Sequence, residues 1–222
     1  MIAWDPENRT DFLKKKILIF TLFICAAIGG SFFYVDLPVA IACRTLDIQI
    51  VSVFQVITRL GDATWYLVPA ALLFLLFHYA WKREQWARWC LFVFSAVAVS
   101  GLTTDLFKWL AGRWRPKAYV HDQLYGFDFF EFGYEANSFP SGHATIIWAF
   151  CMAMTVLFPR YRLVWYILAI LVSISRVIVV AHYLSDVLAG AYVGVMTVML
   201  LKGHPYFRLK PIPGESIPVE NR

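Results

Sequence analysis

Three positively charged side chains stand in or beside apolar stretches of this sequence, where a charge is costly. Lys108 lies at the end of an apolar stretch, and Arg115 follows seven residues later, directly before Pro116. Gly112 and Pro116 indicate that the helix carrying Lys108 ends between them, with Arg115 extended, because a following proline disfavours helical backbone. Arg176 has apolar residues on both sides. A charge within a membrane helix costs about 2.5–3.5 kcal/mol, so such residues commonly serve a function. For Lys108 alone, a simpler interpretation is a side chain that extends to the membrane surface.

Two histidines occur in segments that suit phosphate chemistry. The segment PSGH, which ends at His143, comes directly before an apolar run and predicts the start of a helix. Helix N-termini bind anions through unpaired N–H groups and the helix dipole. His182 and Asp186 are four residues apart and would face each other on a helix. A carboxylate beside a histidine fixes its tautomer and raises its basicity. The simpler alternative is a buried polar pair that joins two helices.

Together these residues predict a site for phosphoryl transfer. The cations and the helix start could hold a phosphate group, with ligands at Lys108, Arg115, Ser141, Gly142 and Arg176. The catalytic groups would be a nucleophile, a general acid and an orienting carboxylate, drawn from His143, His182 and Asp186. The spacing leaves open which histidine has which role. Metal-dependent phosphatases need clustered carboxylates, whereas here only Asp105 lies near Asp186 and the cations would repel a metal ion. We therefore expect no metal and no other cofactor.

The elements that position these residues are membrane-spanning helices. The chain has 222 residues, of which 60% are hydrophobic and 16% charged, whereas soluble domains have about 25% charged residues. A helix needs roughly 20 apolar residues to cross a bilayer. Apolar runs predict six spans, at residues 17–35, 63–81, 89–104, 144–159, 163–181 and 187–201. The predicted fold is an all-α integral membrane protein, a six-helix transmembrane bundle with short interfacial helices on the outer side.

The lysines and arginines indicate how this bundle lies in the membrane. Most of them precede the first span, follow the sixth, or lie between spans two and three or four and five. The positive-inside rule then places both termini in the cytoplasm. Residues 36–62, 105–143 and 176–186 then face the periplasm or exterior, and the last two of these segments carry the predicted site. We expect a bacterial inner (plasma) membrane protein, and no nucleic-acid partner, because the basic residues follow the membrane.

Several other segments carry expectations of their own. Residues 47–60 show helical periodicity and predict a short outer helix in the membrane interface. The aromatic-rich segment 117–137 suits an aromatic belt at the headgroups, or a lip for a lipid substrate. Residues 1–209 are expected to form a single transmembrane phosphatase domain, with 210–222 a disordered cytoplasmic tail. The first apolar run is longer than that of a signal peptide, so it predicts a retained anchor. The four cysteines are scattered and predict no disulfide.

The motifs resemble the three-part signature of the type 2 phosphatidic acid phosphatase superfamily. The three parts occur in order, with matching internal spacing, as Lys108-x6-Arg115-Pro116, Pro140-Ser141-Gly142-His143 and Ser175-Arg176-x5-His182-x3-Asp186. The resemblance implies that His182 is the nucleophile that forms a phosphohistidine, that Asp186 orients it, and that His143 protonates the leaving oxygen. It also implies that Lys108, Arg115, Ser141, Gly142 and Arg176 bind the phosphate.

The leading interpretation is a metal-independent membrane phosphatase that acts on a phosphorylated lipid from the outer face. Undecaprenyl pyrophosphate, phosphatidylglycerol phosphate, phosphatidic acid and lipid A all fit the motifs. A lipid phosphotransferase with the same intermediate is the main alternative, because a phosphohistidine can pass its phosphoryl group to another lipid. A phospholipid-binding carrier fits less well, since paired repeats with broken helices are absent from the sequence. A haloperoxidase, which the superfamily includes, suits a membrane bundle less well than lipid chemistry. The sequence leaves the oligomeric state open.

Overall fold

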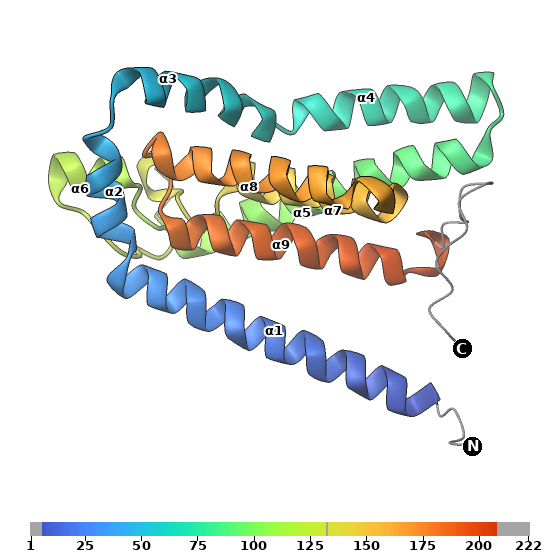
Figure 1. Cartoon of the computed structure of the whole chain (residues 1–222), viewed down its shortest axis with the longest axis horizontal. Coiled ribbons are helices and arrows are strands. Elements are labelled where there is room, and N and C mark those ends of the chain that lie inside the picture. The colour runs from blue at the N-terminus through green and yellow to red at the C-terminus, as the bar shows by residue number, and fades with distance from the viewer. Residues whose placement is uncertain (1–5, 132, 208–222) are drawn as a thin grey trace.

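The computed structural model describes residues 6–131 and 133–207, which are mostly helical and contain no β-strand. The helices run in chain order as α1 (Pro6–Tyr34), α2 (Asp36–Arg44), α3 (Ile48–Ile57), α4 (Thr64–Leu75), α5 (Glu84–Ala111), α6 (Pro116–Asp122), α7 (Gly142–Leu157), α8 (Arg162–Ile178) and α9 (Leu184–Gly203). The long helices lie side by side along one axis (Figure 1). The all-α prediction is confirmed.

Each predicted span coincides with a helix. Five helical stretches of the described residues are long and apolar enough to cross a membrane: Lys14–Tyr34, Ile48–Ala80, Glu84–Ala111, Pro159–Ile178 and Leu184–Gly203. The sixth predicted span corresponds to α7, an apolar helix of 16 residues. The described residues therefore contain six apolar helices at the predicted positions, and the protein is an integral membrane protein. The predicted tail, 210–222, lies outside the described residues.

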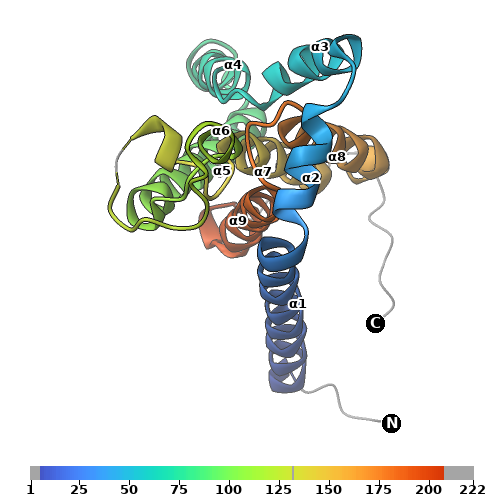
Figure 2. The ribbon, with the colours of Figure 1, turned by 90° about the vertical axis from the view of Figure 1, so that its left-hand side faces the viewer.

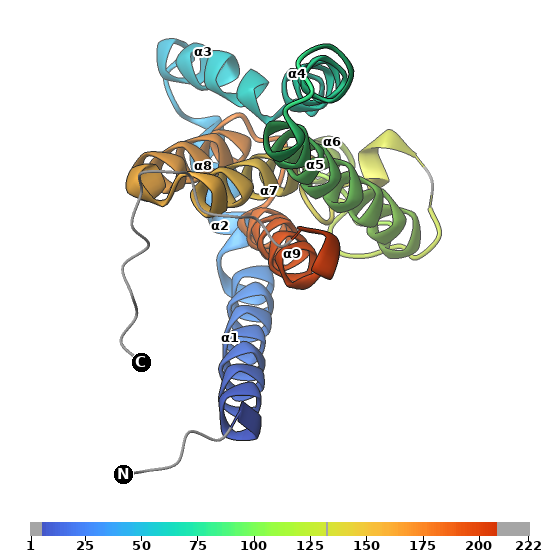
Figure 3. The ribbon, with the colours of Figure 1, turned by 90° about the vertical axis from the view of Figure 1, so that its right-hand side faces the viewer.

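The centre of the bundle is α7, which packs against α5, α8 and α9 (Figure 3). The contact with α9 is close because two glycines of α9 face the backbone of α7. A Cβ at Gly190 would lie 2.5 Å from the carbonyl oxygen of Ser141, and one at Gly194 would lie 2.5 Å from that of Thr145. Small residues four apart are a common way for membrane helices to approach closely. This packing brings the first turn of α9 against the first turn of α7.

Short elements lie around the end of the bundle where α8 stops and α9 begins. α2 crosses this end, and α1 projects from the side of the bundle (Figure 2). α3 runs alongside α8 and continues through the short turn η1 (Thr58–Gly61) into α4 (Figure 1). Its expected place in the membrane interface stays a prediction. α3 contacts α8 along one edge, where Ile57 adjoins a cluster that includes Val172, whereas Ile50, Val53 and Val56 are exposed. All four cysteines are free, as expected.

Candidate active site

Two of the predicted phosphate ligands come from the end of α5 and the segment after it. Gly112 ends α5 with a positive φ of 54°, and Arg115 is extended with φ −75° and ψ 159° before Pro116, as the sequence predicts. Lys108 stays in the last turn of α5. Its Nζ would lie 3.2 Å from a Cβ placed on Gly142, so the ammonium group lies against the start of α7.

The guanidinium of Arg115 is fixed by backbone carbonyl groups. Its Nε donates to the oxygen of Tyr134 at 3.0 Å, and its two terminal nitrogens donate to those of Ala181 at 3.3 Å and Asn137 at 3.2 Å. The ring of Tyr134 also lies 4.3 Å from the guanidinium carbon. A guanidinium has five N–H bonds, so two remain for a phosphate oxygen.

The start of α7 and Arg176 contribute further donors. Ser141 is the N-cap of α7, and its buried hydroxyl has no partner among the described residues. Its own N–H donates to the carbonyl of Asp186 at 3.0 Å, whereas the N–H groups of Gly142 and the following residues belong to the open first turn. Arg176 donates to the hydroxyl of Thr58 at 2.6 Å, while its buried Nε has no described partner. These unpaired donors suit an oxyanion.

The pair His182 and Asp186 forms differently from the helical arrangement that the spacing suggested. α8 ends at Ile178 and α9 begins at Leu184, so His182 lies in the turn between them and Asp186 in the first turn of α9. The Nδ1 of His182 is 3.7 Å from Oδ2 of Asp186 but only 2.8 Å from the backbone oxygen of Ser138. A carbonyl oxygen only accepts hydrogen bonds, so Nδ1 carries the proton and Nε2 keeps a free lone pair. The side chain is buried, with 3% exposure.

Burial also sets the protonation state of His182. Removal from water lowers the pKa of this imidazole to about 4, although the carboxylate of Asp186 acts in the opposite direction. Arg115 and Arg176 add to the lowering. The ring is therefore neutral near pH 7, which is the state that a nucleophile requires.

The second histidine, His143, lies in the first turn of α7 and packs on the η1 turn. A Cβ at Gly61 would lie 2.7 Å from both Cβ and Cδ2 of His143. The ring is also within electrostatic range of Arg176, His182 and Lys108. The structure thus brings both imidazoles and the predicted cations to one end of the bundle.

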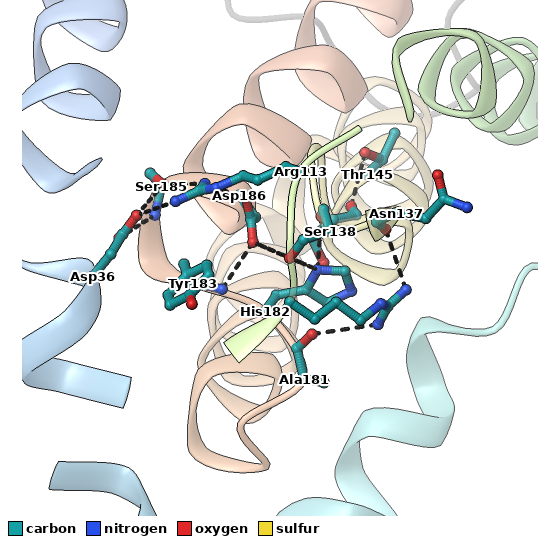
Figure 4. A network of polar contacts seen from close by, with 12 residues as sticks. Asp36, Arg113, Asn137, Ser138, Thr145, Ala181, His182, Tyr183, Ser185 and Asp186 are labelled. Carbon is teal, nitrogen blue, oxygen red and sulfur yellow. Dashed lines mark hydrogen bonds and ion pairs between the residues drawn. The ribbon is translucent and has the colours of Figure 1, made fainter. Parts of the chain in front are cut away.

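Four residues of this region were not singled out from the sequence. Figure 4 shows them around His182 and Asp186: they are Asp36, Arg113, Ser138 and Ser185. Ser138 donates its hydroxyl to Asp186 at 2.6 Å while its backbone oxygen accepts from His182. The sequence could have pointed to Arg113, because it is a basic residue on the predicted outer side, two positions before Arg115. It could not have pointed to its partner Asp36, which is remote in sequence. Within the described residues, no group of three or more histidines, cysteines and carboxylates could hold a metal ion.

Comparison with known proteins assigns the chain to a family. A profile of the PAP2 superfamily matches residues 89–208. The chain belongs to the PAP2 superfamily. The superfamily that the motifs predict is thereby confirmed, and the matched region contains every predicted catalytic and phosphate-binding residue.

Individual relatives are similar over most of the chain. A lipid A 1-phosphatase of Rhizobium etli is 36% identical over 178 residues, which cover 76% of each protein. A lipid A 1-phosphatase of Rhizobium johnstonii is 40% identical over 153 residues, 63% of this chain and 62% of the relative. The crystal structure of a PAP2-type phosphatidylglycerolphosphate phosphatase from Bacillus subtilis matches with a TM-score of 0.57 and 23% identity, over 85% of this chain and 93% of that one. The protein is therefore a PAP2-type lipid phosphatase.

Proposed function

We propose that this PAP2 phosphatase removes the 1-phosphate of lipid A at the outer face of the bacterial inner membrane, through a phosphohistidine on His182 and without a metal ion. The lipid is suggested by the two lipid A 1-phosphatases that the chain resembles over most of its length. The outward orientation is supported by the positive charges at the opposite ends of the helices.

The observation that carries the mechanism is the hydrogen bond from Nδ1 of His182 to the Ser138 carbonyl, 2.8 Å long. It leaves Nε2 as the only unprotonated ring nitrogen. In the first step the Nε2 lone pair attacks phosphorus, and the bond from phosphorus to the lipid oxygen breaks. His143 acts as the general acid and gives a proton to that oxygen. In the second step His143 takes a proton from water, the water oxygen bonds to phosphorus, and the Nε2–P bond breaks.

The phosphate is bound by positive charge and by unpaired donors. Lys108 lies at the N-terminus of α7, and Arg115 has two N–H bonds free after its carbonyl contacts. Arg176 and Ser141 each have a buried donor atom without a described partner. Donors that are already oriented toward the developing negative charge stabilise a transition state effectively. This set of residues provides the charge that a metal ion supplies in other phosphatases.

Exposed aromatic rings lie beside this end of the bundle. Phe129, Phe130 and Tyr134 are each at least 63% exposed. We propose that they border the path by which a lipid headgroup reaches the site while its acyl chains stay in the bilayer.

The test is a lipid panel with purified protein in detergent, before and after exhaustive chelation. We expect release of phosphate from lipid A, loss of the 1-phosphate in the product by mass spectrometry, and unchanged activity after chelation. Phosphatidic acid, phosphatidylglycerol phosphate and undecaprenyl pyrophosphate should be poorer substrates. Preference for one of these three would contradict the assignment of lipid A. Transfer to an acceptor lipid without phosphate release would instead indicate a phosphotransferase, and activity rescued by one specific metal would contradict metal independence.

A further inference from the structure

An ion cluster adjoins the proposed nucleophile and includes two residues with no assigned role: Arg113, at an unspecified position within the first motif, and Asp36, outside all three motifs. The guanidinium of Arg113 lies between the carboxylates of Asp36 and Asp186 (Figure 4). One terminal nitrogen is 2.7 Å from Oδ2 of Asp36, and the other contacts Oδ1 of Asp186. All three side chains have 0% exposure. They come from the α1–α2 corner, the segment after α5 and the start of α9.

We propose that Arg113 and Asp36 are positioning residues for phosphoryl transfer. Arg113 keeps Asp186 ionised beside His182, and Asp36 holds Arg113 in that place. The inference rests on the proposed phosphohistidine mechanism.

The two oxygens of Asp186 have different partners. Oδ1 accepts from Arg113, on the side away from the imidazole. Oδ2 accepts from the hydroxyl of Ser138 at 2.6 Å and the N–H of Tyr183 at 2.9 Å, and it lies 3.7 Å from Nδ1 of His182. A buried carboxylate without a cationic partner takes up a proton near neutral pH. Arg113 is therefore the group that lets Asp186 present a negative charge to the ring.

The charge of the cluster matches the reaction. Two carboxylates and one guanidinium carry a net charge of minus one. When Nε2 of His182 bonds to phosphorus while Nδ1 keeps its proton, the ring gains a positive charge. Ring and cluster are then neutral together. Without the charge of Asp36, the cluster would already be neutral before the reaction. It would therefore stabilise the positive ring less in this water-poor region.

Asp36 is itself fixed by several donors. Its Oδ1 accepts from the hydroxyl of Ser31 at 2.8 Å and from the N–H of Ser185 at 3.0 Å. Its Oδ2 accepts from Arg113 and from the hydroxyl of Ser185. The N–H of Ser185 belongs to the first turn of α9, so Asp36 caps that helix from another part of the chain. The α1–α2 corner is thereby connected to the turn that carries the nucleophile.

Aromatic rings enclose the guanidinium and keep water away. The guanidinium carbon of Arg113 lies 4.9 Å from the ring centre of Phe32, 5.3 Å from that of Phe127 and 4.7 Å from that of Tyr183. Cation–π contacts of this kind gain strength when they are desolvated. Burial acts to lower the pKa of Arg113, but Asp186 and Asp36 outweigh it and raise that pKa, so the charge persists. Part of the aromatic segment 117–137 therefore serves this cluster.

Stability alone is a weak explanation for such a cluster, because desolvation offsets much of the attraction in buried ion pairs. The decisive experiment compares Arg113→Met and Arg113→Lys, using the lipid phosphate that the unaltered protein hydrolyses fastest. In Arg113→Met we expect kcat to fall by about 10²-fold with KM unchanged. Its activity should rise with increasing pH, because Asp186 must lose the proton it has gained. Arg113→Lys keeps the charge and should retain more activity. Arg44→Met, a change at an exposed residue of α2, is the matched control and should be unaffected.

A normal kcat in folded Arg113→Met would overturn the inference. A fall in kcat that is the same at every pH, and that is equally large in Arg113→Lys, would also overturn it. If Arg113→Met does not fold, Asp36→Asn decides. It should lower kcat by about tenfold through loss of electrostatic stabilisation, with KM unchanged, and normal kcat would again overturn the inference. Hydrolysis by the unaltered protein without any phosphohistidine would overturn the proposed function and this inference together. Normal activity of the Arg113 and Asp36 variants beside a trapped phosphohistidine would overturn this inference alone.

Discussion

At the scale of single residues, the site depends on which nitrogen of His182 carries a proton. The carboxylate of Asp186 is the partner that the motif suggests, yet the nearer acceptor is the backbone oxygen of Ser138, at 2.8 Å against 3.7 Å. A backbone carbonyl fixes the tautomer whatever the pH, while the carboxylate supplies charge. In a simple histidine–aspartate pair, the aspartate both fixes the tautomer and supplies the negative charge. In the proposed site, the Ser138 carbonyl fixes the tautomer and Asp186 supplies the charge.

This division predicts the titration of His182. Because burial lowers its pKa to about 4, the ring should stay neutral, with the proton on Nδ1, from pH 8 down to about pH 5. Nitrogen NMR of protein with labelled histidine, assigned by comparison with His182→Asn, measures both properties. Titration near the ordinary histidine pKa of about 6.5, or a proton on Nε2, would contradict the account of the nucleophile.

At the scale of elements, the η1 turn connects α3 to α4 and also contacts two residues of the proposed site. Its first residue, Thr58, accepts a hydrogen bond from Arg176 at 2.6 Å, and its last residue, Gly61, contacts the ring of His143. One short turn therefore adjoins two residues of the proposed site. It can do so because α3 and η1 both contact α8.

Gly61→Ala should disturb the proposed general acid. The new Cβ would come within 2.7 Å of atoms of His143 that lie close to its backbone, so the ring must move. We expect kcat to fall by about 10²-fold for a lipid phosphate, as when a general acid is lost, and to fall much less for an aryl phosphate whose leaving oxygen needs no proton. Gly29→Ala is the control, since nothing lies within 4 Å of its Cβ. Equal losses for both substrates would contradict the role given to His143.

At the scale of the whole molecule, the sequence predicts the helices and the convergence of the motifs better than it predicts their supports. Apolar runs and helix-ending residues such as Gly112 depend on local chemistry, so the spans and the extended Arg115 could be read directly. The interface position of 47–60 stays a prediction, whereas the contact of this segment with α8 depends on a distant part of the chain and could not be read from its local periodicity. Asp36, Ser138 and Gly61 could not be found, because each acts through a contact between parts of the chain that only the fold brings together.

The central claim is that the gathered residues place a phosphoryl group on Nε2 of His182. The most direct measurement is rapid acid-free quenching of the protein during turnover of a lipid substrate carrying radioactive phosphate, followed by mapping of the labelled peptide. We predict acid-labile label on His182, none in His182→Ala, and prolonged label in His143→Ala, where release by water is slowed. Label on another residue, or near-normal turnover by His182→Ala, would contradict the account.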